Sequence, residues 1–145
     1  MKSKLLSSLI ISVLASFLIS SVHAENLKIG EAAPDFTAKD IEGTTISSKD
    51  LHGKITVLEW FSPACHFVRA QYKFALIQRL QKEFREKGVN WYLIASIAPG
   101  KPGYNSNQGY AETLSDLRAH PNAMLLDPDG KIAKQYGTLV TPQVF

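Results

Sequence analysis

The feature that most constrains the fold is a short apolar run followed at once by a turn, a cysteine and a long amphipathic segment. Residues 55–59 (Ile-Thr-Val-Leu-Glu) are typical of a short buried strand. Cys65, the only cysteine, comes six residues later and directly before that segment, so it is expected where a strand ends and a helix begins. Free backbone N–H groups and the helix dipole stabilise a thiolate there. The alternative is an inert cysteine that packs as a small hydrophobe.

The segment after Cys65 has apolar side chains at a four-residue spacing, which predicts one helix over residues 67–87 with a single buried stripe. The stripe comprises Val68, Tyr72, Leu76, Leu80 and Phe84, with Phe67, Phe74 and Ile77 widening it. Charged residues occupy the opposite face, which we interpret as solvated. Gly88 follows as a C-terminal stop.

The rest of the chain alternates strand-like and helix-like segments. We expect a hairpin at 35–38 and 44–46, strands at 89–97 and 123–126 and within 138–145, and helical segments at 47–51, 110–120 and 131–136. Strands that alternate with helices predict an α/β sheet with parallel pairs. The sequence contains no internal repeats and no linker between domains.

The first 24 residues have the pattern of a secretory signal peptide. Lys2 and Lys4 precede an uncharged run over residues 5–22, and Val22-His23-Ala24 predicts cleavage after Ala24. An uncleaved membrane anchor is the alternative, and six serines in the run disfavour it. Residues 25–145 have the length of one domain. We expect this domain to be exported, periplasmic or secreted, and free of the membrane after cleavage.

Charge and cysteine content restrict the partners. Without Lys2 and Lys4 the mature chain has 14 basic and 13 acidic residues, and this near balance indicates no nucleic-acid partner. One cysteine in an exported protein forms no intramolecular disulfide, so the thiol is free, capped or shared with another molecule, for instance in a dimer linked through Cys65. The cysteine and the histidines show no spacing typical of a metal site. We expect neither a metal nor another cofactor.

Three parts of the chain resemble the thioredoxin-like superfamily, in its exported redoxin or peroxiredoxin-like branch of AhpC/TSA type with a single cysteine. They are the opening at 30–36 with 51–54, the turn at 60–68, and the closing part at 126–131, 136–137 and 141–142. The segments Cys-His-Phe-Val-Arg at 65–69 and Ala-Pro-Gly-Lys at 98–101 resemble a peroxiredoxin-like group of this branch. The resemblance covers residues 28–145.

The resemblance implies a thioredoxin-like fold with an N-terminal hairpin and places Cys65 at the first cysteine of the thioredoxin motif. It also implies a substrate groove formed by Thr141 and a cis Pro142 that faces the cysteine. Ser62 matches the Ser or Thr that peroxiredoxins have three residues before their cysteine.

Three further residues near Cys65 have two interpretations each. Arg69, one helical turn on, adds positive potential or lies on a solvated face. His66 stabilises the thiolate when protonated or only shields it. Glu59 accepts a proton near the site or is a solvated residue at a strand end.

The chain also departs from the family pattern. Val68 stands where a dithiol oxidoreductase has its second cysteine, which excludes autonomous dithiol exchange. Leu58 replaces the proline of peroxiredoxins, His66 replaces the proline usual in the group, and no residue fills the role of their pocket arginine. The family continues past its Thr-Pro pair with a further strand and a helix, whereas this sequence stops at Phe145. We therefore expect a C-terminally truncated domain that lacks the last strand and helix.

These observations predict redox chemistry at one cysteine. Cys65 is expected to cycle through a sulfenic acid or a mixed disulfide, with a peroxide or disulfide as substrate and an external thiol as reductant. Two alternatives remain open. One is a binding module that keeps the fold without the chemistry and holds a partner beside Pro142, and the other is a non-functional fragment.

Overall fold

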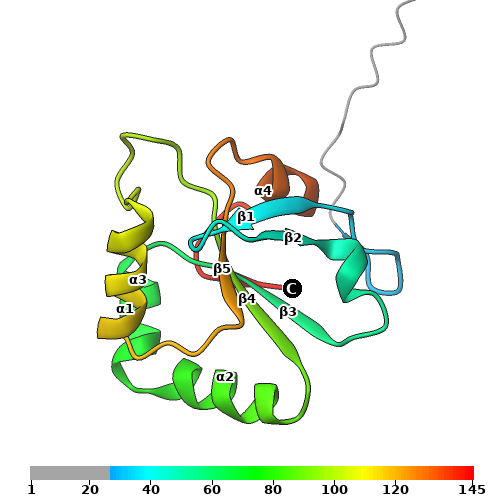
Figure 1. The fold of residues 1–145 in the computed structure, drawn as a ribbon, viewed down its shortest axis with the longest axis horizontal. Coiled ribbons are helices and arrows are strands. Elements are labelled where there is room, and N and C mark those ends of the chain that lie inside the picture. The colour runs from blue at the N-terminus through cyan, green and yellow to red at the C-terminus, as the bar shows by residue number, and fades with distance from the viewer. Residues whose placement is uncertain (1–26) are drawn as a thin grey trace, which may run out of the picture.

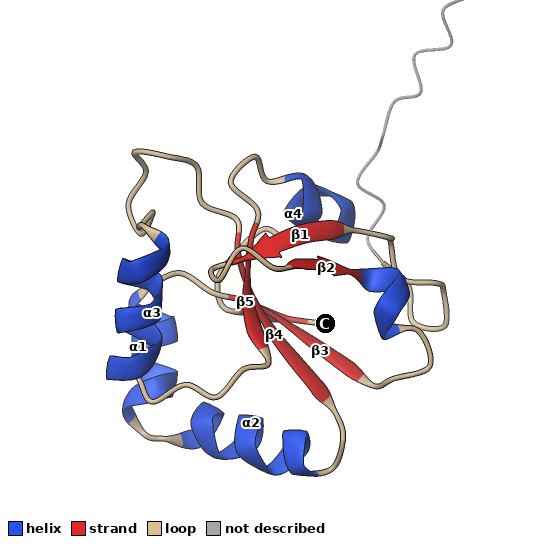
Figure 2. Cartoon of the chain, in the orientation of Figure 1, coloured by secondary structure: helices blue, strands red, loops and turns tan. Residues whose placement is uncertain are grey.

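The structure, a computed structural model, describes residues 27–145 (Figure 2). The predicted signal peptide at 1–24 lies outside the described residues. The elements in chain order are β1 Thr37–Asp40, β2 Thr45–Ser47, the short 3-10 helix η1 Ser48–Leu51, β3 Thr56–Trp60, α1 His66–Lys73, α2 Leu76–Glu86, β4 Asn90–Ala95, α3 Asn107–Asp116, β5 Ala123–Leu126, α4 Lys131–Tyr136 and β6 Gln143–Val144.

The strands form one mixed sheet in the order β2-β1-β5-β4-β3-β6. The central pairs β3–β4 and β4–β5 are parallel, and β1–β2, β1–β5 and β3–β6 are antiparallel. The predicted α/β sheet with parallel pairs and the predicted N-terminal hairpin are therefore confirmed. The strand at 123–126 and the helix at 131–136 have the predicted bounds.

Helices cover both faces of the sheet, and each face buries its own core (Figure 1). On one face α1, α2 and α3 pack against a cluster that includes Phe61, Val68, Tyr72, Trp91 and Tyr110. On the other face α4 packs against a cluster that includes Phe36, Trp60, Ile94, Leu125 and Tyr136. Successive residues of β3 thus point to opposite cores, as expected for a central strand. Within residues 27–145 no helix is both long and apolar enough to cross a bilayer.

The prediction of one helix over residues 67–87 is wrong, because the chain breaks between α1 and α2. Ala75 adopts a left-handed conformation (φ 55°), which is uncommon for a residue with a Cβ. The Gln78 side chain donates to the carbonyls of Tyr72 and Leu117, both at 2.7 Å. These bonds stabilise the break, because they satisfy an end carbonyl of α1 and tie it to the end of α3.

The break also changes which side chains are buried. Phe67 and Phe74 are 62% and 78% exposed, and Leu76 and Phe84 are 45% and 37% exposed. The buried position of α2 is instead Gln81, a polar residue. Of the predicted stripe, Val68 and Tyr72 in α1 are buried, and Ile77 and Leu80 in α2 are partly buried against the same core. The prediction is wrong for the exposed residues Phe67, Phe74, Leu76 and Phe84.

The helix predicted at 110–120 begins earlier, at Asn107, and ends at Asp116. Ser106 precedes it, and its hydroxyl accepts a hydrogen bond from the backbone N–H of Gly109 at 3.1 Å. A serine at this position satisfies one of the free N–H groups of the first turn, so the helix begins at the cap and not at the first apolar residue.

Candidate active site

Cys65 lies where β3 gives way to α1, as predicted. Ser62, Pro63, Ala64 and Cys65 form a tight turn, in which the Cys65 N–H donates to the Ser62 carbonyl at 3.1 Å. Proline in the second position favours such a turn because its φ is fixed in the required range. The Cys65 carbonyl then accepts from the Arg69 N–H at 3.1 Å, the first bond of α1. The turn and the helix together fix the direction of the Cys65 side chain.

The sulfur faces the segment that precedes β6. Cys65 Sγ lies 3.1 Å from the Thr141 carbonyl oxygen, and the Thr141–Pro142 peptide bond is cis. β6 follows directly and pairs with β3, so that Gln143 lies opposite Trp60. The sheet thus brings the Thr141–Pro142 segment next to the cysteine, in the arrangement that the resemblance implies.

The surroundings of the sulfur stabilise its charged form. Burial raises the pKa of the Cys65 thiol. Hydrogen bonds from the Thr141 side chain and from the backbone N–H groups of Val68 and Phe67 lower this pKa, and together they outweigh burial. The pKa of Cys65 is therefore below its ordinary value. The bond to the Thr141 carbonyl needs a proton on sulfur, so this bond must be given up when the thiolate forms. The half-buried sulfur combines thiolate stabilisation with access to solvent.

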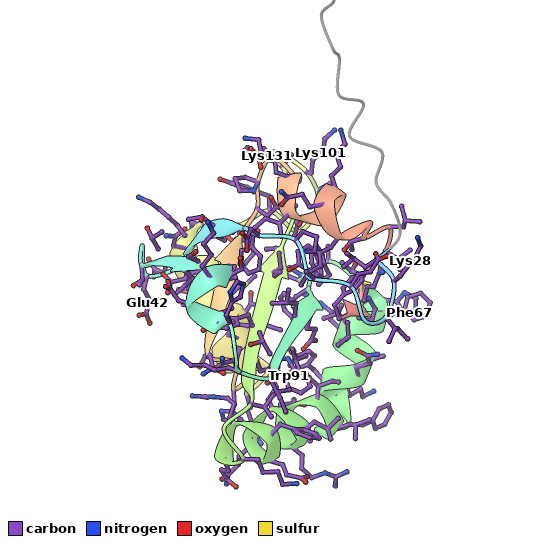
Figure 3. The ribbon with its side chains drawn as sticks, turned by 90° about the vertical axis from the view of Figure 1, so that its right-hand side faces the viewer. Lys28, Glu42, Phe67, Trp91, Lys101 and Lys131 are labelled. Atoms are coloured by element: carbon purple, nitrogen blue, oxygen red, sulfur yellow. The ribbon has the colours of Figure 1, made fainter. Side chains whose placement is uncertain are left out.

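The other predicted site residues lie around this turn with distinct contacts. Ser62 is half-buried and closes the turn through its carbonyl. His66 is exposed, and the centroid of its ring lies 4.0 Å from the centroid of the Phe67 ring. Figure 3 shows Phe67 at the margin of the molecule. Arg69 Nε donates to the Pro63 carbonyl at 2.7 Å, so Arg69 fastens α1 to the turn.

The two segments that meet at the thiol carry exposed apolar side chains. Leu139 and Val140, which precede Thr141, are 88% and 62% exposed, and Phe67 follows Cys65 by two residues. Apolar side chains at a partly exposed thiol favour contact with a protein or peptide over a small polar solute.

Glu59 is not a solvated strand end, and that interpretation was wrong. The side chain is 1% exposed, and its carboxylate accepts hydrogen bonds from Trp91 Nε1 (2.8 Å), the Tyr72 hydroxyl (3.2 Å) and Gln81 Nε2 (3.5 Å). Burial raises the pKa of Glu59, and these three bonds lower it in part. The sequence gives no local signal for this network, because its members come from β3, β4, α1 and α2.

Gly103 is a residue that the sequence analysis did not single out. It lies in the loop between β4 and α3, and a Cβ at this position would lie 2.7 Å from Ser62 Oγ. Its place among several glycines and prolines in residues 98–109 predicted only a loop. Among residues 27–145, no group of three or more His, Cys, Asp or Glu side chains is arranged to hold a metal ion.

The chain is similar to thiol-disulfide oxidoreductases and to their structures. The sequence model of the AhpC/TSA family matches residues 29–145. ResA of Oceanobacillus iheyensis, a thiol-disulfide oxidoreductase, is 30% identical over 152 aligned residues that cover 90% of this chain and 77% of the relative. ResA of Bacillus thuringiensis subsp. konkukian is 27% identical over 121 residues, which cover 83% of this chain and 64% of the relative.

Among solved structures, a secreted disulfide oxidoreductase of Mycobacterium tuberculosis, homologous to E. coli DsbE, gives a TM-score of 0.60 at 22% identity. The match covers 75% of this chain and 72% of that chain. At this identity the similarity establishes the fold, which is thioredoxin-like.

Proposed function

Because the chain belongs to the AhpC/TSA family, we propose that it is a thiol redox protein that works through the single sulfur of Cys65. One observation carries the proposal. Cys65 lies at the start of α1, half-buried and facing Thr141, where hydrogen bonds lower its pKa. A thiolate is the nucleophile in both disulfide exchange and peroxide reduction. The names of the ResA relatives support the same class of chemistry.

Disulfide exchange is the first candidate reaction. The Cys65 thiolate attacks one sulfur of a substrate disulfide, a bond forms between the two sulfurs, and the second substrate sulfur leaves as a thiolate. Val68 stands where a second cysteine would resolve this mixed disulfide. An external thiolate therefore attacks the substrate sulfur, takes it as a new disulfide and releases Cys65 as a thiolate. Thr141 and Pro142 form the wall against which the substrate segment lies.

Peroxide reduction is the second candidate, favoured by the absence of a second cysteine from the sequence. The thiolate attacks one peroxide oxygen, the O–O bond breaks, and Cys65 becomes a sulfenic acid while the other oxygen leaves and takes up a proton. An external thiol then condenses with the sulfenic acid to a mixed disulfide and water, and a second thiol restores Cys65. Without a reductant, the Cys65 thiol of a second copy condenses in the same way and gives a disulfide-linked dimer.

The pH dependence of Cys65 alkylation by iodoacetamide tests the proposal. Since Cys65 is the only cysteine, the purified protein needs no cysteine-free background, and Cys65→Ser is the blank. We expect half-maximal reactivity clearly below the free-thiol value of about 8.5. A midpoint at or above that value would refute redox chemistry and favour a binding module with the same fold.

Two products then separate the candidate reactions. Formation of a mixed disulfide with an added peptide disulfide, detected by mass, supports exchange. Trapping of a peroxide-treated thiol by dimedone supports the sulfenic acid, and a dimer on a non-reducing gel supports coupling of two Cys65 sulfurs. If neither a mixed disulfide nor a dimedone adduct forms, both reactions are excluded.

We also propose that the chain is exported and that the signal peptide is cleaved after Ala24. The sequence of residues 1–24 supports this, as does the secreted state of the similar Mycobacterium tuberculosis protein. The mass of the protein recovered from the exported fraction tests it, since cleavage leaves Glu25 as the first residue. Recovery of the full-length mass from the membrane would favour an uncleaved anchor.

A further inference from the structure

The loop between β4 and α3 makes close backbone contact with the cysteine turn, and Gly103 is the point of contact. Gly103 has a φ of +90°, and a Cβ added to it would lie 2.7 Å from Ser62 Oγ, 3.2 Å from Ala64 Cβ and 3.4 Å from Ala64 N. The position therefore favours glycine for two independent reasons, its left-handed backbone and the lack of space. Gly100, in the same loop, has a φ of +77° but no atom within 4 Å of an added Cβ.

The loop is held in this place by α3. The hydroxyl of Tyr110, a residue of α3 that is 2% exposed, donates to the Gly103 carbonyl at 3.3 Å. Asn105 lies directly over Gly109, where an added Cβ would clash with the Asn105 side chain. The Asn105 side chain also accepts from the Ser106 N–H at 2.9 Å. These contacts fix the end of the loop to the first turn of α3. The contact between the loop and the cysteine turn is therefore supported by Tyr110, a residue of the core.

The contact acts on the part of the turn that orients the sulfur. The Ser62 carbonyl accepts from the Cys65 N–H, and Ala64 precedes Cys65 directly. Movement of Ser62 or Ala64 therefore moves Cys65 relative to the Thr141 carbonyl, 3.1 Å away. It also moves the sulfur relative to the N–H groups of α1, which stabilise the thiolate.

We propose that the loop 98–105 is a structural part of the thiol site and that Gly103 is a positioning residue for Cys65, because the contact with Ser62 and Ala64 holds the turn in its reactive geometry. This inference rests on the redox function proposed above. It assigns Gly103 no contact with substrate and no part in bond breaking. Its consequence is that a change in the loop, with the turn and α1 left intact, alters thiol reactivity.

A pair of glycine variants tests the proposal. Gly103→Ala introduces both backbone strain and the clash with the turn, whereas Gly100→Ala introduces strain of the same kind without a clash. We expect the alkylation midpoint of Cys65 to rise in Gly103→Ala, with reactivity at neutral pH roughly three- to tenfold lower, since one pH unit changes the thiolate fraction about tenfold. Gly100→Ala should keep the wild-type midpoint. Equal midpoints in the two variants would overturn the proposal.

Coupling to the turn gives a second readout. In a Ser62→Ala background the shortest clash of an alanine at 103 is gone, so the effect of Gly103→Ala on the midpoint should be smaller than in the wild type. An equal effect in both backgrounds would overturn the role of Ser62 and assign the contact to Ala64 alone.

A milder variant keeps the test decisive if Gly103→Ala does not fold. Tyr110→Phe removes only the hydroxyl that bonds to the Gly103 carbonyl, and the matched control is Tyr104→Phe in the same loop, 45% exposed. We expect a smaller rise of the midpoint in Tyr110→Phe and none in Tyr104→Phe. Identical midpoints would refute the role of the loop. A wild-type midpoint at or above about 8.5 would instead refute the redox function itself, so the two failures are distinguishable.

Discussion

Two buried carboxylates lie on opposite faces of the sheet and are satisfied in different ways. Asp127, 2% exposed, accepts from the backbone N–H groups of Ile132 (3.1 Å) and Ala133 (3.0 Å) and from the Ser96 hydroxyl (2.5 Å). Glu59, 1% exposed, accepts from side chains of α1, α2 and β4. The donors to Asp127 therefore come mainly from the residues that follow it in the chain, whereas the donors to Glu59 come from three other elements of the fold.

The two carboxylates stabilise different parts of the structure on the two faces of the sheet. Asp127 caps α4, a helix of six residues that is too short to be stable by itself. Ser96 links Asp127 to β3, because its hydroxyl also accepts a hydrogen bond from Trp60 Nε1 at 3.0 Å. Glu59 instead binds Tyr72, in the last turns of the helix that carries Cys65 at its start. One carboxylate thus stabilises a local turn, and the other joins the cysteine helix to the sheet.

The largest effect is expected from removal of the Glu59 carboxylate. Glu59→Leu leaves Trp91 Nε1 and the Tyr72 hydroxyl without an acceptor in the core. Each buried donor left unpaired costs about 1–3 kcal/mol, so for two donors the free energy of unfolding should fall by about 2–6 kcal/mol. Urea denaturation measures this loss. The control is Glu86→Leu on the exposed face of α2, which should change stability little. Equal losses in the two variants would show that the Glu59 network contributes nothing.

Asp127→Ala should have a smaller and more local effect. Loss of a helix cap costs about 0.5–2 kcal/mol, and the Ser96 hydroxyl loses its acceptor in addition. We expect hydrogen exchange of the α4 amides to accelerate well before that of β3 and β4. Gln135→Ala is the control, because Gln135 lies in α4 itself and is exposed. Uniform acceleration across the sheet would contradict a local role.

The same contrast explains how much could be predicted from the sequence. The turn Asp127-Pro128-Asp129-Gly130 indicated the end of β5 and the start of α4 at the residues where the structure has them. The place of Cys65 between a strand and a helix also followed from local pattern. These features depend on neighbours in the chain, whose spacing is visible in the sequence.

Apart from the start of α3, which a local cap sets, the failures depend on contacts between distant segments. Nothing near Ala75 indicates a left-handed residue, since the bonds from Gln78 that stabilise the break reach across to Leu117. Glu59 appeared solvated because its donors are spread over three other elements. The contact of Gly103 with Ser62 is equally invisible, because a glycine in a loop of glycines and prolines has no pattern that distinguishes close packing from flexibility.

The smallest effect is a pH dependence of the unfolding free energy that arises from Glu59. Burial raises the pKa of Glu59 above its ordinary value of 4.5, so the folded state binds the proton more tightly than the unfolded state. The contribution of Glu59 is therefore fully present below pH 4.5 and is lost as pH rises through the raised pKa, by at most about 1.4 kcal/mol per pH unit. Glu59→Gln removes the titration. We therefore measure the unfolding free energy of the wild type minus that of Glu59→Gln, in urea from pH 4 to 8. This difference should decline with pH and then level off. A difference that rises with pH would instead mean that the three hydrogen-bond donors outweigh burial and favour the ionised carboxylate.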